Sequence, residues 1–585
     1  MTGTPRETRR PAIQSPSPSA NGRTRPVKKH PHANLVGRPD ADTVLLPKLT
    51  RPKQEVGRAR ARVPAKAPDE YTLPLDAEWL ERPDAGPAAA PRRRTLISRV
   101  VLALILCGQA ALTLRLSNTV FQNEALYLFA GHWELAHLLH GVPSQGDFIT
   151  YLPGVPALYP ELGAALVNIG GLTVARAFSL AEMLVVTACA YSLTRHLFNE
   201  RVALCAAALF SVSEATILLG HLATIDATSL CLLAVGTWVV VRTASWPWRA
   251  YLLAAPLVAL AVAVSYSTLL YLPAVALLAG LAAVPYFGRP AMSRTLIFGG
   301  VSVLMIAMAA ALAGPQFTTA VESSLSSHGT VALTQILFDS GRWAGLTIAL
   351  AAFGAAAFAV RARTEPGELI MPAGDRTRRT MLGACLAGTA LIAPLDQLSL
   401  HSEDSLATMI AFGAFLAAPM AGVGMARLIG DHFRRPLAGV AVFALALTLG
   451  LGQAARYPGA WADTPQLVSW LARYLQPGAH YLVEDDDIPM YYLDNRPDAQ
   501  PSQFTSTYYI GYRTAHGKLL TGTAGFLAAI KAGYFRVIIY DSTVTPTLDK
   551  VLAQALEAAP NYQLTAAFTG TANSVRTTCF VWTRI

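Results

Sequence analysis

Charged residues are scarce in this chain. Only 14% of its 585 residues are Asp, Glu, Lys or Arg, whereas 53% are hydrophobic. Soluble domains carry about 25% charged residues, so this composition excludes an ordinary soluble protein. Several apolar runs approach the roughly 20 residues that a helix needs to cross a bilayer. The chain is therefore predicted to be a polytopic α-helical membrane protein.

Cysteine provides no framework in this sequence. Five of the six cysteines fall within apolar runs, and the sixth stands alone near the C-terminus: Cys107, Cys189, Cys205, Cys231, Cys385 and Cys579. This distribution predicts neither a disulfide framework nor a cysteine-based zinc site. The histidines also lack the spacing of a metal-ligand motif, so we expect no cofactor and no obligatory metal, and a divalent metal is an alternative that the sequence does not indicate.

The first 92 residues lack any sustained apolar periodicity. They are rich in Pro, Arg, Ser and Ala and cannot bury enough surface to offset the entropy of ordering, which predicts a disordered tail over 1–92. Residues 1–94 hold 19 Lys and Arg against 10 Asp and Glu, or +9 of the total charge of +10. The basic balance therefore belongs to a tail and does not indicate a nucleic-acid partner. About ninety polar residues precede the first apolar run, which we interpret as an uncleaved anchor.

The apolar runs predict about eleven membrane spans within a transmembrane domain over 93–455. They lie at about 96–116, 171–195, 202–219, 224–242, 250–265, 267–286, 296–313, 342–360, 380–395, 405–426 and 436–453. Arg residues concentrate in alternate loops, which favours a cytoplasmic N-terminus under the positive-inside rule. With an odd number of spans, residues 456–585 are then expected outside the cell, and the protein in the plasma membrane.

The C-terminal residues have the composition of a soluble domain. Strands are predicted at 480–483, 536–540, 562–568 and 575–583, and helices at 464–475, 522–532 and 546–558. This order predicts a small extracytoplasmic α/β domain over 456–585. The acidic run Glu484-Asp485-Asp486-Asp487 follows a predicted strand, where α/β sheets often bind ligands. We interpret it as a solvated acidic turn.

Polar groups at the outer ends of the spans are the candidates for chemistry. The first outer loop, 117–170, contains Asn123 and Glu124, and Asp226 lies two residues into a later apolar run. A carboxylate in a membrane segment is costly and indicates a functional or paired role. The alternative for both carboxylates is a structural role at the start of a helix, where the amide dipole favours negative charge.

The outer loop also contains a recognisable series of motifs. Phe121-Gln122-Asn123-Glu124-Ala125-Leu126-Tyr127 is followed by a Pro- and Tyr-rich segment that includes Tyr159, and then by Ala223-Thr224-Ile225-Asp226-Ala227. From about 96 to 455 the chain resembles the GT-C glycosyltransferases, the membrane enzymes that include protein O-mannosyltransferases and aminoarabinose transferases. In that family an Asp-Glu pair and a Tyr begin the first outer loop, and a Thr-x-Asp turn opens the fourth span.

The resemblance implies transfer of a sugar from a polyprenyl-phosphate carrier to a glycan, lipid or protein acceptor, in contact with membrane lipids. It places Glu124, Asn123 and Asp226 at the catalytic centre. Tyr127, Arg176, Tyr159 and His221 are expected to bind substrate, with Arg176 beside the leaving phosphate. A single inverting displacement needs one carboxylate base. The chain has Asn123 where the family usually has Asp, so the sequence assigns the base to Glu124.

The same departure supports an alternative function. An amide cannot accept a proton at neutral pH, so a relative with Asn123 can be catalytically inactive. In that case the protein is a lipid-carrier transporter or an envelope-assembly scaffold. The candidate acids lie at the outer ends of spans, whereas transporters place ionisable groups near the membrane midplane, and this difference favours surface chemistry.

Overall fold

The computed structural model describes most of the chain after the tail. The described residues are 92–116, 119–141, 152, 154–155, 158–313, 331–360, 373–402, 405–430, 434–455, 464–494, 496, 498–542, 545–572 and 575–585. Apart from Arg92, the predicted tail over 1–92 lies outside them, as does most of the segment between 142 and 157.

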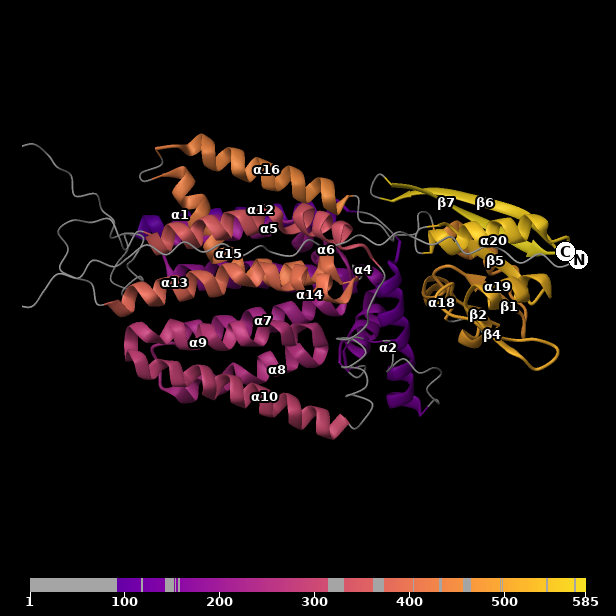
Figure 1. Ribbon diagram of the computed structural model, residues 1–585, viewed down its shortest axis with the longest axis horizontal. Coiled ribbons are helices and arrows are strands. Elements are labelled where there is room, and N and C mark those ends of the chain that lie inside the picture. The colour runs from indigo at the N-terminus through magenta and orange to yellow at the C-terminus, as the bar shows by residue number, and fades with distance from the viewer. Residues whose placement is uncertain are drawn as a thin grey trace, which may run out of the picture. The chain divides into compact units, whose positions relative to one another are not determined.

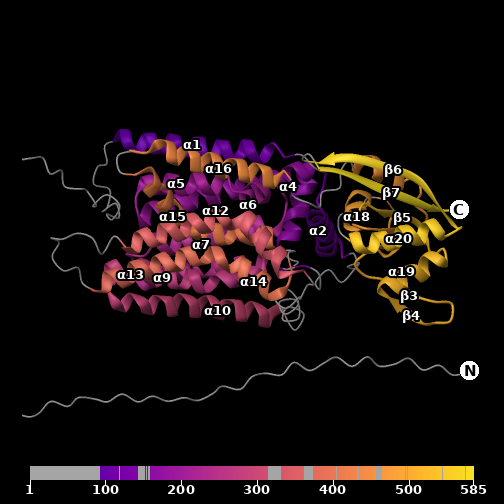
Figure 2. The same ribbon diagram turned by 45° about the horizontal axis from the view of Figure 1, so that its top comes forward.

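The helical part runs from Arg92 to Ala454 and contains long, roughly parallel helices (Figures 1 and 2). Its α-helices are α1 (Arg92–Leu114), α2 (Gln122–His140), α4 (Tyr159–Leu197), α5 (Glu200–Ser211), α6 (Glu214–His221), α7 (Ile225–Arg242), α8 (Ala255–Val264), α9 (Leu272–Phe287), α10 (Ser293–Ala313), α12 (Leu333–Val360), α13 (Ala373–Gly388), α14 (Ile392–Leu400), α15 (Leu406–Ile429) and α16 (Pro436–Ala454). Short 3-10 helices are η2 (Trp248–Leu253), η3 (Tyr266–Tyr271), η4 (Arg289–Met292) and η6 (Thr389–Leu391).

The chain is a polytopic membrane protein, with nine or ten candidate spans among the described residues where about eleven were expected. Nine helices among the described residues are long and apolar enough to cross a bilayer. The pair α5 and α6, bent by 62°, makes a tenth span if it crosses as one unit. The run predicted at 250–265 falls short because η2 precedes an α8 of only 10 residues. At 1.5 Å per residue α8 covers about half of the ~30 Å hydrocarbon core.

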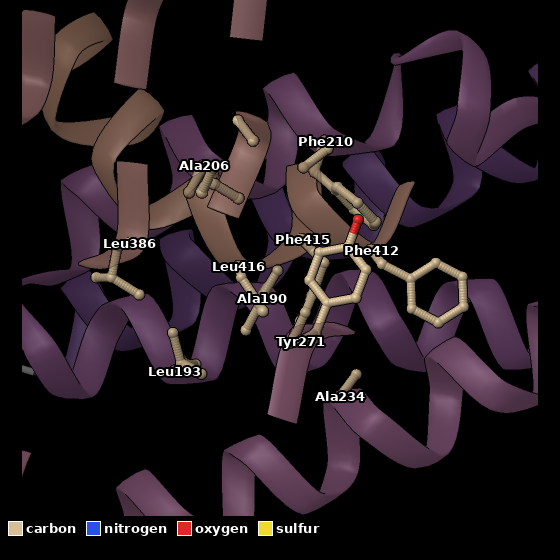
Figure 3. Packing of buried hydrophobic residues seen from close by; sticks show 14 of the residues in the cluster. Ala190, Leu193, Ala206, Phe210, Ala234, Tyr271, Leu386, Phe412, Phe415 and Leu416 are labelled. Atoms are coloured by element: carbon tan, nitrogen blue, oxygen red, sulfur yellow. The ribbon is translucent and has the colours of Figure 1, made fainter. Parts of the chain in front are cut away.

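The core of the helical part is built around α15. Buried residues make up 94% of its apolar window, as expected for a helix that is apolar on all sides and surrounded by others. Tyr271 stacks on Phe412 at 5.7 Å between ring centroids and donates a hydrogen bond to the Met409 carbonyl (Figure 3). Phe210 meets Phe415 edge-to-face. These contacts join α5, η3 and α15 into one buried cluster.

Helix α4 is broken where the sequence predicts the second span to begin. Gly170 and Gly171 have non-helical backbone angles, and Gly171 has φ 71°, a left-handed conformation that glycine adopts without steric cost. The break separates an initial segment from the apolar run that carries Arg176. Because Arg176 lies within the first two turns after the break, its side chain is close to the outer loop.

The C-terminal part is a mixed α/β domain, which confirms the predicted fold class. Its five-stranded sheet has the order β2-β1-β5-β7-β6, with β1 parallel to β2 and β5, and β7 antiparallel to β5 and β6. The strands are β1 (His480–Val483), β2 (Phe504–Thr505), β5 (Phe535–Tyr540), β6 (Tyr562–Ala572) and β7 (Val575–Arg584), with β3 (Gly511–Arg513) and β4 (Leu519–Thr521) in a separate pair. The helices are α17 (Thr464–Leu471), α18 (Asp487–Leu493), α19 (Gly522–Lys531), α20 (Pro546–Ala558) and the 3-10 helix η8 (Pro501–Gln503).

Candidate functional site

The site is built around the first turn of α2. Helix α2 begins at Gln122, directly after the N-cap residue Phe121. Glu124 is the third residue of the helix, and its Oε2 accepts a hydrogen bond from the Phe121 backbone N–H at 2.8 Å. This contact is one half of a capping box, so the structural role considered for Glu124 is present.

Glu124 also joins two segments that lie far along the chain. Its Oε1 accepts from Arg176 Nε at 2.9 Å and from the Ala223 backbone N–H at 2.7 Å, and its Oε2 accepts from Arg176 Nη2 at 2.6 Å. The carboxylate is fully buried. Glu124 therefore connects α2, the part of α4 that follows the Gly170-Gly171 break, and the turn between α6 and α7.

These contacts occupy the Glu124 carboxylate. An ionised carboxylate offers about four lone-pair positions, and four N–H groups fill them here. To accept a proton from a substrate, Glu124 would first have to release one of these partners. Catalysis by Glu124 stays a prediction, while the observed geometry gives it the role of holding three segments together.

The Arg176 side chain is held by hydrogen bonds to other protein groups. Besides its two contacts with Glu124, its Nη2 donates to the Thr119 carbonyl at 3.0 Å. Its side chain is 15% exposed. Arg176 is thus a member of a buried ion pair, and its expected place beside a leaving phosphate stays a prediction.

Asp226 has a different environment from Glu124. It lies in the first turn of α7, three residues after the Ala223 N–H that Glu124 binds, and is partly exposed. Its N-cap residue Thr224 makes no side-chain capping bond. Within the described part of the chain, the Asp226 carboxylate has no hydrogen-bond or ion-pair partner. Of the predicted acids, Asp226 is the one with open oxygen atoms.

The other predicted residues gather near this centre. His221, at the end of α6, hydrogen-bonds the Thr113 backbone and lies within electrostatic range of Glu124 and Arg176. Tyr127 and Tyr159 are buried and meet edge-to-face at 6.4 Å between ring centroids. Both tyrosines belong to a small cluster with Ile225, the residue before Asp226. Sequence reasoning therefore selected residues that lie in one region.

Asn123 is exposed at the start of α2. Its neighbour Gln122 lies 3.4 Å from the Tyr508 hydroxyl and hydrogen-bonds the Asp487 side chain. The Val120 N–H also donates to the Tyr492 hydroxyl at 3.3 Å. The start of α2 is thus in contact with α18 of the C-terminal domain, and the position where the family usually has an acid lies beside that contact.

Sequence reasoning missed Glu182, on α4. Its Oε2 accepts a hydrogen bond from Thr228 Oγ1 at 2.8 Å, two residues after Asp226, and the side chain is partly buried. The signal was available, because Glu182 is an acid inside the apolar run predicted as the second span, and such residues are rarely without function.

The interpretation of the acidic run as a solvated turn is wrong. Glu484 and Asp485 are fully buried at the carboxyl end of β1. The Glu484 carboxylate accepts from the backbone N–H groups of Asp541, Ser542 and Thr545 at 2.6, 2.8 and 2.8 Å. Backbone N–H groups in this position commonly bind an anionic ligand. Here the chain's own carboxylate fills that position and closes the loop between β5 and α20.

Burial of this cluster changes its titration. Burial, followed by the neighbouring Asp541 and Glu484 charges, raises the pKa of Asp485 well above its ordinary value. Burial and the adjacent Glu484 raise the pKa of Asp549 to about 8. Among the described residues, no group of three or more His, Cys, Asp or Glu side chains is arranged to hold a metal ion.

Comparison with known proteins finds a family match within the helical part. Residues 153–313 match the family model described as dolichyl-phosphate-mannose-protein mannosyltransferase, a range that includes Arg176, His221 and Asp226. The resemblance to GT-C glycosyltransferases is confirmed. No curated protein matches the chain.

Solved structures resemble the chain at low identity, and one of them reaches a TM-score of 0.50. The archaeal oligosaccharyltransferase AglB from Archaeoglobus fulgidus, in complex with an inhibitory peptide and a dolichol-phosphate, is 14% identical with a TM-score of 0.50, over 83% of this chain and 74% of that chain. ArnT from Cupriavidus metallidurans in the apo state is 13% identical with a TM-score of 0.49, over 84% of this chain and 98% of that chain. At this identity the likeness concerns the fold alone.

Proposed function

We propose that this chain is a glycosyltransferase that moves a sugar from a polyprenyl-phosphate carrier to an acceptor on the outer face of the plasma membrane. The family match over 153–313 supports the reaction class. The observation that carries the proposal is the ion-paired Glu124, which fixes the family-like start of α2 against the family-like turn before Asp226. The acceptor is a glycan, a lipid or a protein.

In this proposal Asp226 is the general base. Its carboxylate accepts the proton of the acceptor hydroxyl while the acceptor oxygen bonds to the anomeric carbon. The bond from that carbon to the phosphate oxygen breaks in the same step, and polyprenyl phosphate leaves with the electron pair. The configuration inverts, so a second nucleophilic carboxylate is unnecessary. A positioned base contributes about 10²–10⁴-fold to such a step.

The remaining residues have supporting roles. Glu124 is a positioning residue that holds the Ala223 turn and orients Arg176. Arg176 contributes positive charge near the donor phosphate without leaving its ion pair. Tyr127, Tyr159 and His221 shape the wall of the substrate site, and Asn123 hydrogen-bonds the acceptor from its exposed position.

The assay uses the full-length protein in vesicles with labelled polyprenyl-phosphate sugars and cell-envelope acceptors. Transfer of label to an acceptor with inverted configuration supports the proposal. Complete absence of transfer across the common carrier-linked sugars, from protein that still binds polyprenyl phosphate, contradicts it.

A second function has one specific observation in its favour. Asn123 stands at the family's usual acid position, and the adjacent Glu124 is occupied by four N–H groups. A non-catalytic carrier-binding protein, acting as transporter or assembly scaffold, needs no open base. Binding of polyprenyl phosphate without transfer in the same assay supports this alternative.

A further inference from the structure

A second polar site lies within the helical part, at the bend between α5 and α6. The 62° bend lets α16 approach the chain so closely that a Cβ on Gly450 would lie 1.9 Å from the Val212 carbonyl oxygen. Beside this contact lies a partly open pocket lined by residues of α5, α6, α12, α15 and α16 and by Ser213, just before α6. Figure 2 shows α5, α6, α12 and α16 as neighbours.

The pocket contains a buried acid that the proposed mechanism does not use. Glu214, the first residue of α6, is 2% exposed and lines the pocket. Neither of its carboxylate oxygens has a hydrogen-bond partner within the described part of the chain. A buried carboxylate without a partner costs several kcal/mol. Such a group in a membrane span points to a bound ligand that donates hydrogen bonds.

The pocket is also lined by a cationic side chain. Arg342 of α12 also lines the pocket, acts electrostatically on Glu214, and has 36% of its side chain exposed. Its Nη1 is 4.0 Å from Asp339, at the limit of an ion pair. Among the described residues, Glu214 and Arg342 make no direct ion pair with each other. The pocket is therefore lined by one carboxyl group and one guanidinium group that are not paired with each other.

Most of the remaining lining is apolar, and Ser213, Thr347 and Gln453 add polar groups to it. Hydrocarbon walls come from three helices, through Leu209, Phe210, Leu346, Leu350 and Leu449. A ligand that fits this lining has a hydrocarbon part and a headgroup with one positive and one negative end. We propose that this pocket binds the headgroup of an aminophospholipid, with its ammonium on Glu214 and its phosphate on Arg342.

Other membrane lipids match the pocket less well. An anionic lipid would place a negative phosphate beside Glu214 without neutralising it. A trimethylammonium headgroup carries the charge but donates no N–H to the carboxylate oxygens. The primary ammonium of phosphatidylethanolamine neutralises Glu214 and offers three donors, as the lysine ammonium does in a charge-assisted hydrogen bond.

The test is native mass spectrometry of the full-length protein released from vesicles that contain equal amounts of dioleoyl phosphatidylethanolamine, phosphatidylcholine and phosphatidylglycerol. We expect the parent protein to retain one phosphatidylethanolamine. Glu214→Gln keeps the shape of the side chain and should lower that retention roughly tenfold or more, which corresponds to about 1.4 kcal/mol of binding. Arg342→Gln should have a similar effect.

Glu200→Gln is the matched control. Glu200 lies on the same bent helix pair, but its carboxylate accepts from the Tyr191 hydroxyl and does not line the pocket. Ala418→Phe is a second test variant if Glu214→Gln fails to insert into the membrane, because Ala418 lines the pocket and a larger side chain should displace the lipid.

Equal retention of the three lipids by the parent, or an unchanged preference in Glu214→Gln and Ala418→Phe, overturns the proposal. Sugar transfer is not measured, so this result is independent of the proposed function.

Discussion

Arg176 and Glu124 form a bidentate ion pair, with N–O distances of 2.9 and 2.6 Å, in which the carboxylate is fully buried. The pair joins α2 to α4, and the Ala223 N–H adds the start of α7. Breaking one partner of such a pair is more costly than replacing both, because the remaining charge stays buried without compensation. The pair is therefore both a structural connection and a fixed charge next to the proposed donor site.

Replacing either partner alone should destabilise the protein. We expect Arg176→Ala and Glu124→Gln each to lower the free energy of unfolding by about 3–5 kcal/mol. The double variant should recover part of this loss, since it leaves no unpaired charge. Thermal unfolding in detergent of the parent, both single variants and the double variant measures the coupling. Additive losses would show that the two side chains do not depend on each other.

The close packing of α12 on α15 depends on glycine at one position and not at another. A Cβ on Gly354 would lie 1.9 Å from the Met420 carbonyl oxygen, whereas a Cβ on Gly345 would meet nothing within 4 Å. Gly354→Ala should therefore force the helices apart and cost about 1–3 kcal/mol or more. Gly345→Ala is the matched control on the same helix and should be neutral or slightly stabilising. Similar unfolding temperatures for the two variants would contradict this packing.

The C-terminal domain should lose stability as the pH rises. The pKa of Asp549 is raised from its ordinary 3.8 to about 8, so its contribution is complete below its ordinary pKa and is lost as the pH approaches 8. The pKa of Asp485 shifts in the same direction. Hydrogen exchange of β1 and β5, corrected for the intrinsic rate, should show stronger protection at pH 5.5 than at pH 9. Asp549→Asn should reduce this difference, and equal protection at the two pH values would contradict the prediction.

The side of the membrane on which the C-terminal domain lies can be tested by labelling a cysteine in that domain. The native Cys579 is unsuitable for this. Cys579 is 2% exposed, and its Sγ lies 3.8 Å from Asp541 Oδ2 as a hydrogen-bond donor. Burial raises the pKa of its thiol, which slows reaction further. Tyr509 is 66% exposed in the same domain. With the C-terminus outside the cell, Tyr509→Cys in a Cys579→Ala background should react with a membrane-impermeant maleimide in unbroken cells, and labelling only after lysis would reverse the orientation.

Regular elements were predictable where local signals were strong. The strand at His480–Val483 and the helix at Pro546–Ala558 have the predicted bounds, the latter because proline at the first helical position fixes its start. Helix α18 was missed because it has only seven residues and begins with an acidic run that resembles a turn. Its packing against α2, in a buried cluster that contains Ile488 and Ala125, is a tertiary effect.

The candidate site was predictable in its members but not in its contacts. Glu124, Arg176, His221 and Asp226 were selected from motifs and topology. However, Arg176 and the Ala223 N–H lie 52 and 99 residues from Glu124 along the chain. No periodicity in the sequence shows that these groups would occupy the Glu124 carboxylate. We therefore propose Asp226 as the base in place of Glu124 and keep both residues in the candidate site.

The most direct test of this account is the single-turnover rate of sugar transfer by Asp226→Asn, compared with the parent protein and Glu124→Gln. Asp226→Asn keeps the size of the side chain and removes its basicity. We predict that its rate falls by about 10²-fold or more while donor affinity and unfolding temperature stay near those of the parent. Glu124→Gln should instead lower the unfolding temperature together with the rate. An Asp226→Asn protein whose rate is within roughly threefold of the parent would contradict the assignment of Asp226 as the base.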